Sequence, residues 1–102
     1  MNKKANRRII CKDGFEMSVQ ADEGTYCMPR IDGAEKYISV EVGFPNEPEP
    51  LLMRWAESPG APCNTVYGYV PIQVIIDVCA KHGGIVTGEL PPGIPYLEAQ
   101  ED

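Results

Sequence analysis

Residues 71–82, PIQVIIDVCAKH, limit the possible folds of this chain more than any other stretch. Apolar side chains recur there at the spacing of one helix face, namely Ile72, Ile75, Ile76 and Cys79. Pro71 suits a first helical turn, and glycines at 83 and 84 are typical of a helix end. Because a helix with such a broad apolar face must cover another layer, the stretch predicts a sheet elsewhere in the chain.

Alternating patterns supply that sheet. The segment RIICKDGFEMSVQA, residues 8–21, predicts a hairpin with a two-residue turn at Asp13-Gly14 that places Ile10 opposite Met17. In EKYISVEVGF, residues 35–44, the alternation predicts a strand with four inward side chains, Ile38, Val40, Val42 and Phe44. The ten prolines and ten glycines exclude long helices from most of the chain.

The predicted fold is therefore a single α+β domain. We expect a small, mainly antiparallel sheet of about four strands, with the principal helix, about residues 71–82, packed on one face. The domain spans residues 9–86. A basic arm, residues 1–8, precedes it, and an acidic, proline-rich tail, residues 87–102, follows it and is expected to be partly disordered.

The charge distribution bears on the partners. The first 12 residues carry five basic side chains and no acidic one, whereas the chain from Asp13 onward carries 15 acidic and 4 basic residues, a net charge of −11. Nucleic-acid backbones repel such a body, so we expect no direct nucleic-acid binding by it. We interpret the basic arm as a solvated tail. An acidic body suits a basic protein groove, including one that normally holds nucleic acid.

No stretch has the length and apolar character of a membrane span, and the N-terminus lacks the apolar region of a signal peptide. The expected location is the cytoplasm, with no membrane contact.

The cysteines and the single histidine do not form a recognisable metal signature. The four cysteines, Cys11, Cys27, Cys63 and Cys79, are separated by 16, 36 and 16 positions, whereas zinc sites use close pairs. We predict no metal and no cofactor. His82 is interpreted as part of the helix end, where a cationic side chain is favourable; the alternative is a site formed with Cys79 one turn away.

Several side chains are candidates for binding. Tyr67 and Tyr69 flank Gly68 and share one side if that stretch is extended. With Tyr26, Trp55 and Arg30 they form either an aromatic and cationic pocket or the wet rim of the core. Motifs of the common catalytic and phosphate-binding sites are absent from the sequence, so we predict that the protein is not an enzyme.

The chain contains five characteristic strings in this order: IICKDGFEMSVQA, YCMPR, VEVGFPNEPEPLLM, TVYGYVP and KHGGI. With these strings it resembles a group of small uncharacterised proteins found in phages and prophages. The resemblance covers about residues 9–86 and implies a phage-type origin, but it transfers no site residue. Small acidic phage proteins are similar to two kinds of antagonists of bacterial immunity. One kind occupies the nucleic-acid groove of a CRISPR effector, and the other sequesters a nucleotide signal, often between subunits.

We therefore expect an anti-CRISPR-like inhibitor that occupies a host defence protein through exposed carboxylates, with Glu47, Glu49 and Glu57 as candidates. The alternative is a sponge for a cyclic nucleotide or related signal, for which both a monomer and a homo-oligomer stay open. In that alternative Arg30 and His82 contact phosphate, and Tyr26, Tyr67 or Tyr69 stacks on a base. A virion assembly factor is a third reading.

Overall fold

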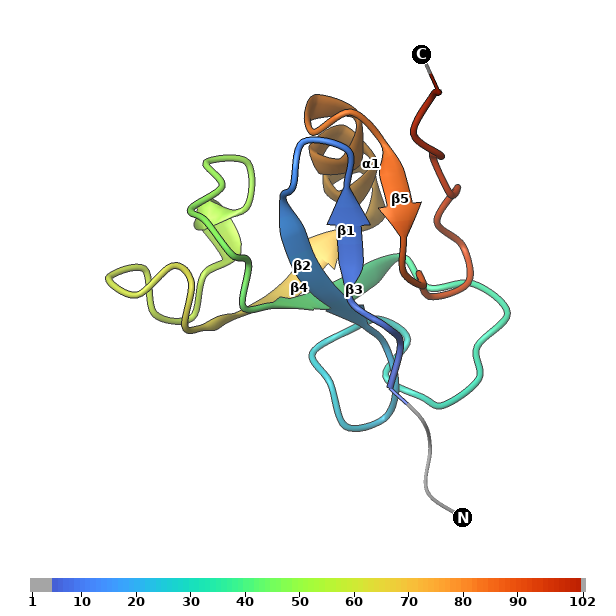
Figure 1. Ribbon diagram of the computed structural model, residues 1–102. Coiled ribbons are helices and arrows are strands. Elements are labelled where there is room, and N and C mark those ends of the chain that lie inside the picture. Colours follow the sequence, from blue (N-terminus) through green and yellow to red (C-terminus); the bar gives the residue numbers. More distant parts are fainter. Residues whose placement is uncertain (1–4, 102) are drawn as a thin grey trace.

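The computed structural model describes residues 5–101. Five strands form one sheet in the order β4-β3-β2-β1-β5, with every neighbouring pair antiparallel (Figure 1). The strands are β1 (Ile9–Cys11), β2 (Glu16–Gln20), β3 (Ser39–Gly43), β4 (Val66–Pro71) and β5 (Ile85–Thr87). A 3₁₀ turn, η1 (Met53–Trp55), precedes β4, and one helix, α1 (Ile72–Lys81), follows it. The predicted α+β class is confirmed, with five strands where about four were expected.

The β1–β2 hairpin has a register different from the predicted one. Ile9, and not Ile10, lies opposite Met17, and the Cys11 amide donates to the carbonyl of Phe15 at 2.8 Å. The connection is therefore a three-residue loop that ends at Gly14 with φ of +95°, a conformation that glycine adopts without strain. The inward alternation of Phe15, Met17 and Val19 is nevertheless found, because it depends on β2 alone.

The strand β3 is shorter than its apolar pattern. Val40 and Val42 are fully buried as predicted, but Ile38 is 63% exposed and Phe44 is 48% exposed. Phe44 has φ of +49°, which turns the chain out of the strand, and Tyr37 is buried instead of Ile38. The alternating pattern predicts Tyr37 on the outer face of the strand. The preceding loop accepts its side chain instead, and the Tyr37 hydroxyl donates to the carbonyl of Ile31 there.

Helix α1 ends as its sequence predicts. The Gly83 amide donates to the Ala80 carbonyl, and the Gly84 amide donates to the Cys79 carbonyl. Both glycines have φ of +89°. This pair of bonds is the Schellman arrangement, which satisfies the last carbonyls of the helix. Ile75, Val78 and Cys79 bury the core-facing stripe. His82 follows as the C-cap, fixed in position by the end of the helix.

Both flanking segments contact the domain. Residues 1–4 of the predicted basic arm lie outside the described residues, but Arg7 and Arg8 form ion pairs with Glu89 and Glu16. After β5 the chain turns back and lies beside that strand, with a parallel bridge between Ile85 and Glu98 (Figure 1). Ile94 is buried as well. Packing therefore continues past residue 86, the predicted end of the domain.

Substitution of Gly88 can test how closely this C-terminal segment packs on the domain. A Cβ at position 88 would lie 2.5 Å from the Arg8 carbonyl oxygen and 2.7 Å from Ile9 Cα, at a φ of +125°. We expect Gly88→Ala to lower the free energy of unfolding by about 2 kcal/mol or more, measured by urea denaturation. At Gly60 a Cβ meets no atom within 4 Å, so Gly60→Ala should change the value by less than about 0.5 kcal/mol. Equal effects of the two variants would contradict the packing described.

Candidate functional site

A bulge in β4 separates two tyrosines that the sequence places together. The pairing with β3 shifts between Val40–Val70 and Val42–Tyr67, and Tyr69 has φ of +55°. As a result Tyr67 is fully buried, with its hydroxyl donating to the carbonyl of Pro62, while Tyr69 is 45% exposed. The prediction that both tyrosines share one side is wrong, because the bulge reverses the alternation.

The exposed Tyr69 lies beside Tyr26. Its amide donates to the Tyr26 carbonyl at 2.9 Å, and the two ring centroids are 5.8 Å apart. A Cβ at Gly68 would lie 3.1 Å from the Tyr26 Cβ, so a glycine there allows Tyr26 to lie against β4. The guanidinium carbon of Arg30 lies 5.1 Å from the Tyr26 ring centroid, a cation–π arrangement.

The segment after η1 forms the other wall. Ala56 bridges to Tyr67, and the Glu57 amide donates to the Val66 carbonyl at 3.0 Å. Trp55, the last residue of η1, and Glu57 flank Ala56, and both line the same hollow. The resulting aromatic cleft has a volume of about 320 Å³ and is lined by Tyr26, Trp55, Glu57, Gly68 and Tyr69. It is the candidate binding site.

The left-handed backbone at Tyr69 is unusual for an aromatic residue. For L-amino acids this conformation costs about 1–2 kcal/mol. It persists here because the bulge and the bond to Tyr26 fix it. Phe44, which does not line the cleft, has φ of +49°, so a left-handed aromatic residue is not by itself a mark of the cleft.

A charge cluster lies around His82, in which His82 and Glu49 are buried and Asp13 and Lys81 are about half exposed. Its Nδ1 is 2.6 Å from Asp13 Oδ2, and its Nε2 is 2.6 Å from Glu49 Oε1. The Lys81 amine also contacts Glu49, at 3.0 Å. The Phe15 ring stacks on the imidazole with centroids 4.2 Å apart. Because the side chains of His82 and Glu49 are 8% and 1% exposed, this charge cluster is part of the fold and not an open site.

Opposite charges shift the pKa values in the charge cluster. Burial opposes protonation of His82, but hydrogen bonds to Glu49 and Asp13 outweigh it and raise the imidazole pKa. The pKa of Asp13 is lowered, first by the Phe15 amide and then by His82. Burial opposes ionisation of Glu49, but the Leu51 amide, His82 and Lys81 together lower its pKa. The cluster therefore holds an imidazolium between two carboxylates.

The structure divides the candidate residues into separate groups. Tyr26, Trp55, Glu57 and Tyr69 line the aromatic cleft. Arg30 lies over the Tyr26 ring, and Glu47 is exposed. Tyr67 is in the core, and His82 has both ring nitrogens occupied by carboxylates, so neither faces a ligand.

Glu49, predicted to be a solvated carboxylate of a proline-rich loop, is buried instead, which corrects that prediction. Sequence analysis also missed Asp13 and Lys81. Asp13 contacts His82, 69 positions away, and Lys81 contacts Glu49, 32 positions away. No local sequence pattern links residues at such separations.

The cysteines contribute to the core. All four are free; Cys11, Cys27 and Cys79 are buried, and Cys63 is exposed. The hydrogen bond between the thiols of Cys11 and Cys79, together with burial, raises the pKa of Cys79. Within residues 5–101 no group of three or more histidine, cysteine or acidic side chains is arranged to hold a metal ion.

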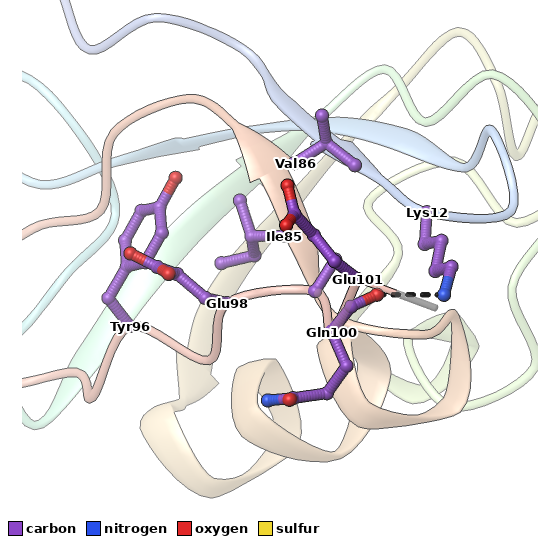
Figure 2. A pocket seen from close by; sticks show the side chains of 8 residues that line it. Lys12, Ile85, Val86, Tyr96, Glu98, Gln100 and Glu101 are labelled. Carbon is purple, nitrogen blue, oxygen red and sulfur yellow. Dashed lines mark hydrogen bonds between the residues drawn. The ribbon is translucent and has the colours of Figure 1, made fainter.

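A larger hollow of about 850 Å³ lies between β5 and the C-terminal segment (Figure 2). The Lys12 amine closes one side of it by donating to the Gln100 carbonyl at 2.8 Å. Ile85, Val86 and Tyr96 lie beside carboxylates there. The lining is chemically mixed and contains none of the predicted binding residues, so the aromatic cleft remains the better candidate.

Comparison of the chain with protein-family models, with curated proteins and with solved structures gave no match. In the described part of the chain no helix has the length and apolar character needed to cross a membrane.

The charge cluster can be tested through Glu49. Removing one partner of a buried ion pair leaves the others uncompensated, so we expect Glu49→Gln to lower the free energy of unfolding by about 3 kcal/mol. Glu47→Gln, an exposed change two positions away, should alter it by less than about 0.5 kcal/mol. Chemical denaturation at pH 6 measures both. If Glu49→Gln is as stable as Glu47→Gln, the carboxylate does not contribute as described.

The charge cluster also predicts a pH dependence. His82 stabilises the fold fully below its ordinary pKa of 6.5, and this contribution is lost as the pH rises through the raised folded-state pKa. The contributions of Asp13 and Glu49 are present above their ordinary values of 3.8 and 4.5, and are lost as the pH falls through the lowered values.

Stability should therefore be highest between about pH 5 and pH 6.5. His82→Gln should remove most of the decrease on the alkaline side when unfolding is measured across pH. The same decrease in His82→Gln would show that another group causes it.

Proposed function

We propose that this chain is a non-enzymatic binding protein of phage type that antagonises a bacterial immune system by occupying a basic surface of a host defence protein. The observation that carries the proposal is the aromatic cleft: two tyrosines and the single tryptophan, partly exposed, on a body with a net charge of −11. Tyrosine and tryptophan dominate the energetics of protein interfaces, and an acidic surround favours a basic partner. The defence context is supported by the phage resemblance of residues 9–86.

The distribution of exposed carboxylates agrees with this proposal. Glu57 lines the aromatic cleft, and Glu47 is exposed. Carboxylates around an interface speed encounter with a basic partner and make binding sensitive to salt. Glu49 is excluded from this role because it is buried in the charge cluster.

A sponge for a nucleotide signal is the second candidate. It is favoured by the position of Arg30 over the Tyr26 ring, because an arginine beside exposed aromatic rings suits a phosphate next to a stacked base. Tyr67 and His82 no longer belong to this candidate, since one is in the core and the other is saturated by carboxylates.

The first experiment expresses the chain in bacterial strains that each carry one defence system, including several CRISPR types, and measures the plaquing efficiency of a restricted phage. The chain should restore plaquing in at least one strain. The double variant Glu47→Lys/Glu57→Lys should lose this effect, because it reverses the charge of the carboxylate that lines the aromatic cleft and of a second exposed candidate carboxylate.

The matched control is Glu98→Lys/Glu101→Lys, which has the same change in net charge on the C-terminal segment and should retain the effect. If the wild-type chain restores plaquing in none of the strains, the proposed function is wrong. Equal loss in both double variants would mean that only the total charge matters.

Native mass spectrometry of the purified protein separates the second candidate from the first. Under the protein-partner proposal the native and denatured masses agree. A nucleotide-sized addition that Arg30→Ala removes would instead establish the sponge, since the Arg30 guanidinium lies over the exposed Tyr26 ring.

A further inference from the structure

We propose that the aromatic cleft binds a cationic side chain, an arginine or lysine, presented by the basic partner protein. This inference rests on the proposed function and assigns the chemistry of its contact point. Tyr26, Trp55 and Tyr69 provide the rings, and Glu57 provides the counter-charge.

The lining of the cleft is suited to a cation. Of the five residues that line it within the described chain, only Glu57 carries a charge. Aromatic ring faces have negative electrostatic potential and attract a guanidinium or ammonium group, and a carboxylate beside them adds to the attraction. A phosphate-bearing ligand would instead meet the Glu57 carboxylate at close range, which is unfavourable.

Two of the chain's own arginines lie within cation–π distance of rings of the cleft. Arg30 lies 5.1 Å from the Tyr26 centroid, and Arg54 lies 5.7 Å from the Trp55 centroid. Neither arginine lines the cleft itself. Tyr69, which completes the lining, is held in its exposed position at the cost of a strained backbone. The volume of about 320 Å³ suits one long side chain better than a folded segment.

Trp55 is the single tryptophan of the chain and reports on the cleft directly. The test titrates the full-length protein with L-arginine amide, with adenosine monophosphate, and with sodium chloride at matched ionic strength, and follows Trp55 fluorescence. Arginine amide should give a saturable change with half-saturation at about 1 to 50 mM, as expected for a few cation–π contacts. Adenosine monophosphate and sodium chloride should give no saturable change.

Two variants test the residues. Tyr69→Gly relieves the left-handed strain and removes one ring, so it should fold with an unchanged or higher melting temperature and bind arginine amide about 2- to 5-fold more weakly. Phe44→Gly is the matched control. Phe44 also has a positive φ and is 48% exposed, but it does not line the cleft, so binding should be unchanged. Glu57→Gln should fold normally and bind arginine amide more weakly. Because this substitution leaves the backbone conformation unchanged, it tests the cleft independently of Tyr69→Gly.

Three results would overturn the inference. They are a response to arginine amide no different from that to sodium chloride, saturation by adenosine monophosphate alone, and equal loss of binding in Tyr69→Gly and Phe44→Gly. The plaquing assay stays independent of these results. If arginine amide fails to bind but the wild-type chain restores plaquing, only the cleft assignment is wrong. Arginine amide binding without any effect on plaquing would refute the proposed function and leave the cleft assignment in place.

Discussion

The contact of His82 with two carboxylates joins three distant segments of this structure. Asp13 comes from the β1–β2 loop, Glu49 from the proline-rich loop, and His82 from the end of α1. These segments are far apart in the sequence, and the ionic contacts join them around one imidazole. Burying charges is costly unless each is paired. Here Lys81 and His82 balance two carboxylates, so the charge cluster is neutral as a whole.

This charge cluster also bears on the aromatic cleft. Glu49 is followed within a few residues by η1, which ends at Trp55 and is followed by Glu57; both residues are on one wall of the cleft. The opposite wall depends on β4, whose bulge turns Tyr69 outward beside Tyr26. The cleft is thus built from a loop that an ion pair anchors and from a strand that is locally strained.

The elements that depend on local pattern were predictable from sequence. The helix and its glycine end follow from a 3.6-residue period and from Gly83 and Gly84, and the inward face of β2 follows from alternation. The hairpin register was not predictable in the same way, because Gly14 permits both a two-residue and a three-residue connection. Periodicity also failed at Tyr69, where one extra residue reverses the alternation.

The candidate site was predictable in composition and only partly in position. Residue type indicated Tyr26, Arg30, Trp55, Tyr67 and Tyr69 as binding residues. Tyr26, Trp55 and Tyr69 line the aromatic cleft, Arg30 lies over the Tyr26 ring, and Tyr67 is in the core. The roles of Glu49 and His82 were not predictable, since the pair forms only when the fold joins two distant segments. A glutamate in a proline-rich loop has the local signature of a solvated residue. Burial of this kind is decided by tertiary structure.

The most direct test of the binding account is hydrogen–deuterium exchange of the protein alone and in complex with the effector of a defence system that it blocks. If the aromatic cleft is the contact surface, the effector should slow exchange in the segments around Tyr26, around Trp55 to Glu57, and around Gly68 and Tyr69, while β5 and residues 88–101 stay unchanged. Slowing confined to β5 and the C-terminal segment, with the cleft unaffected, would contradict the account.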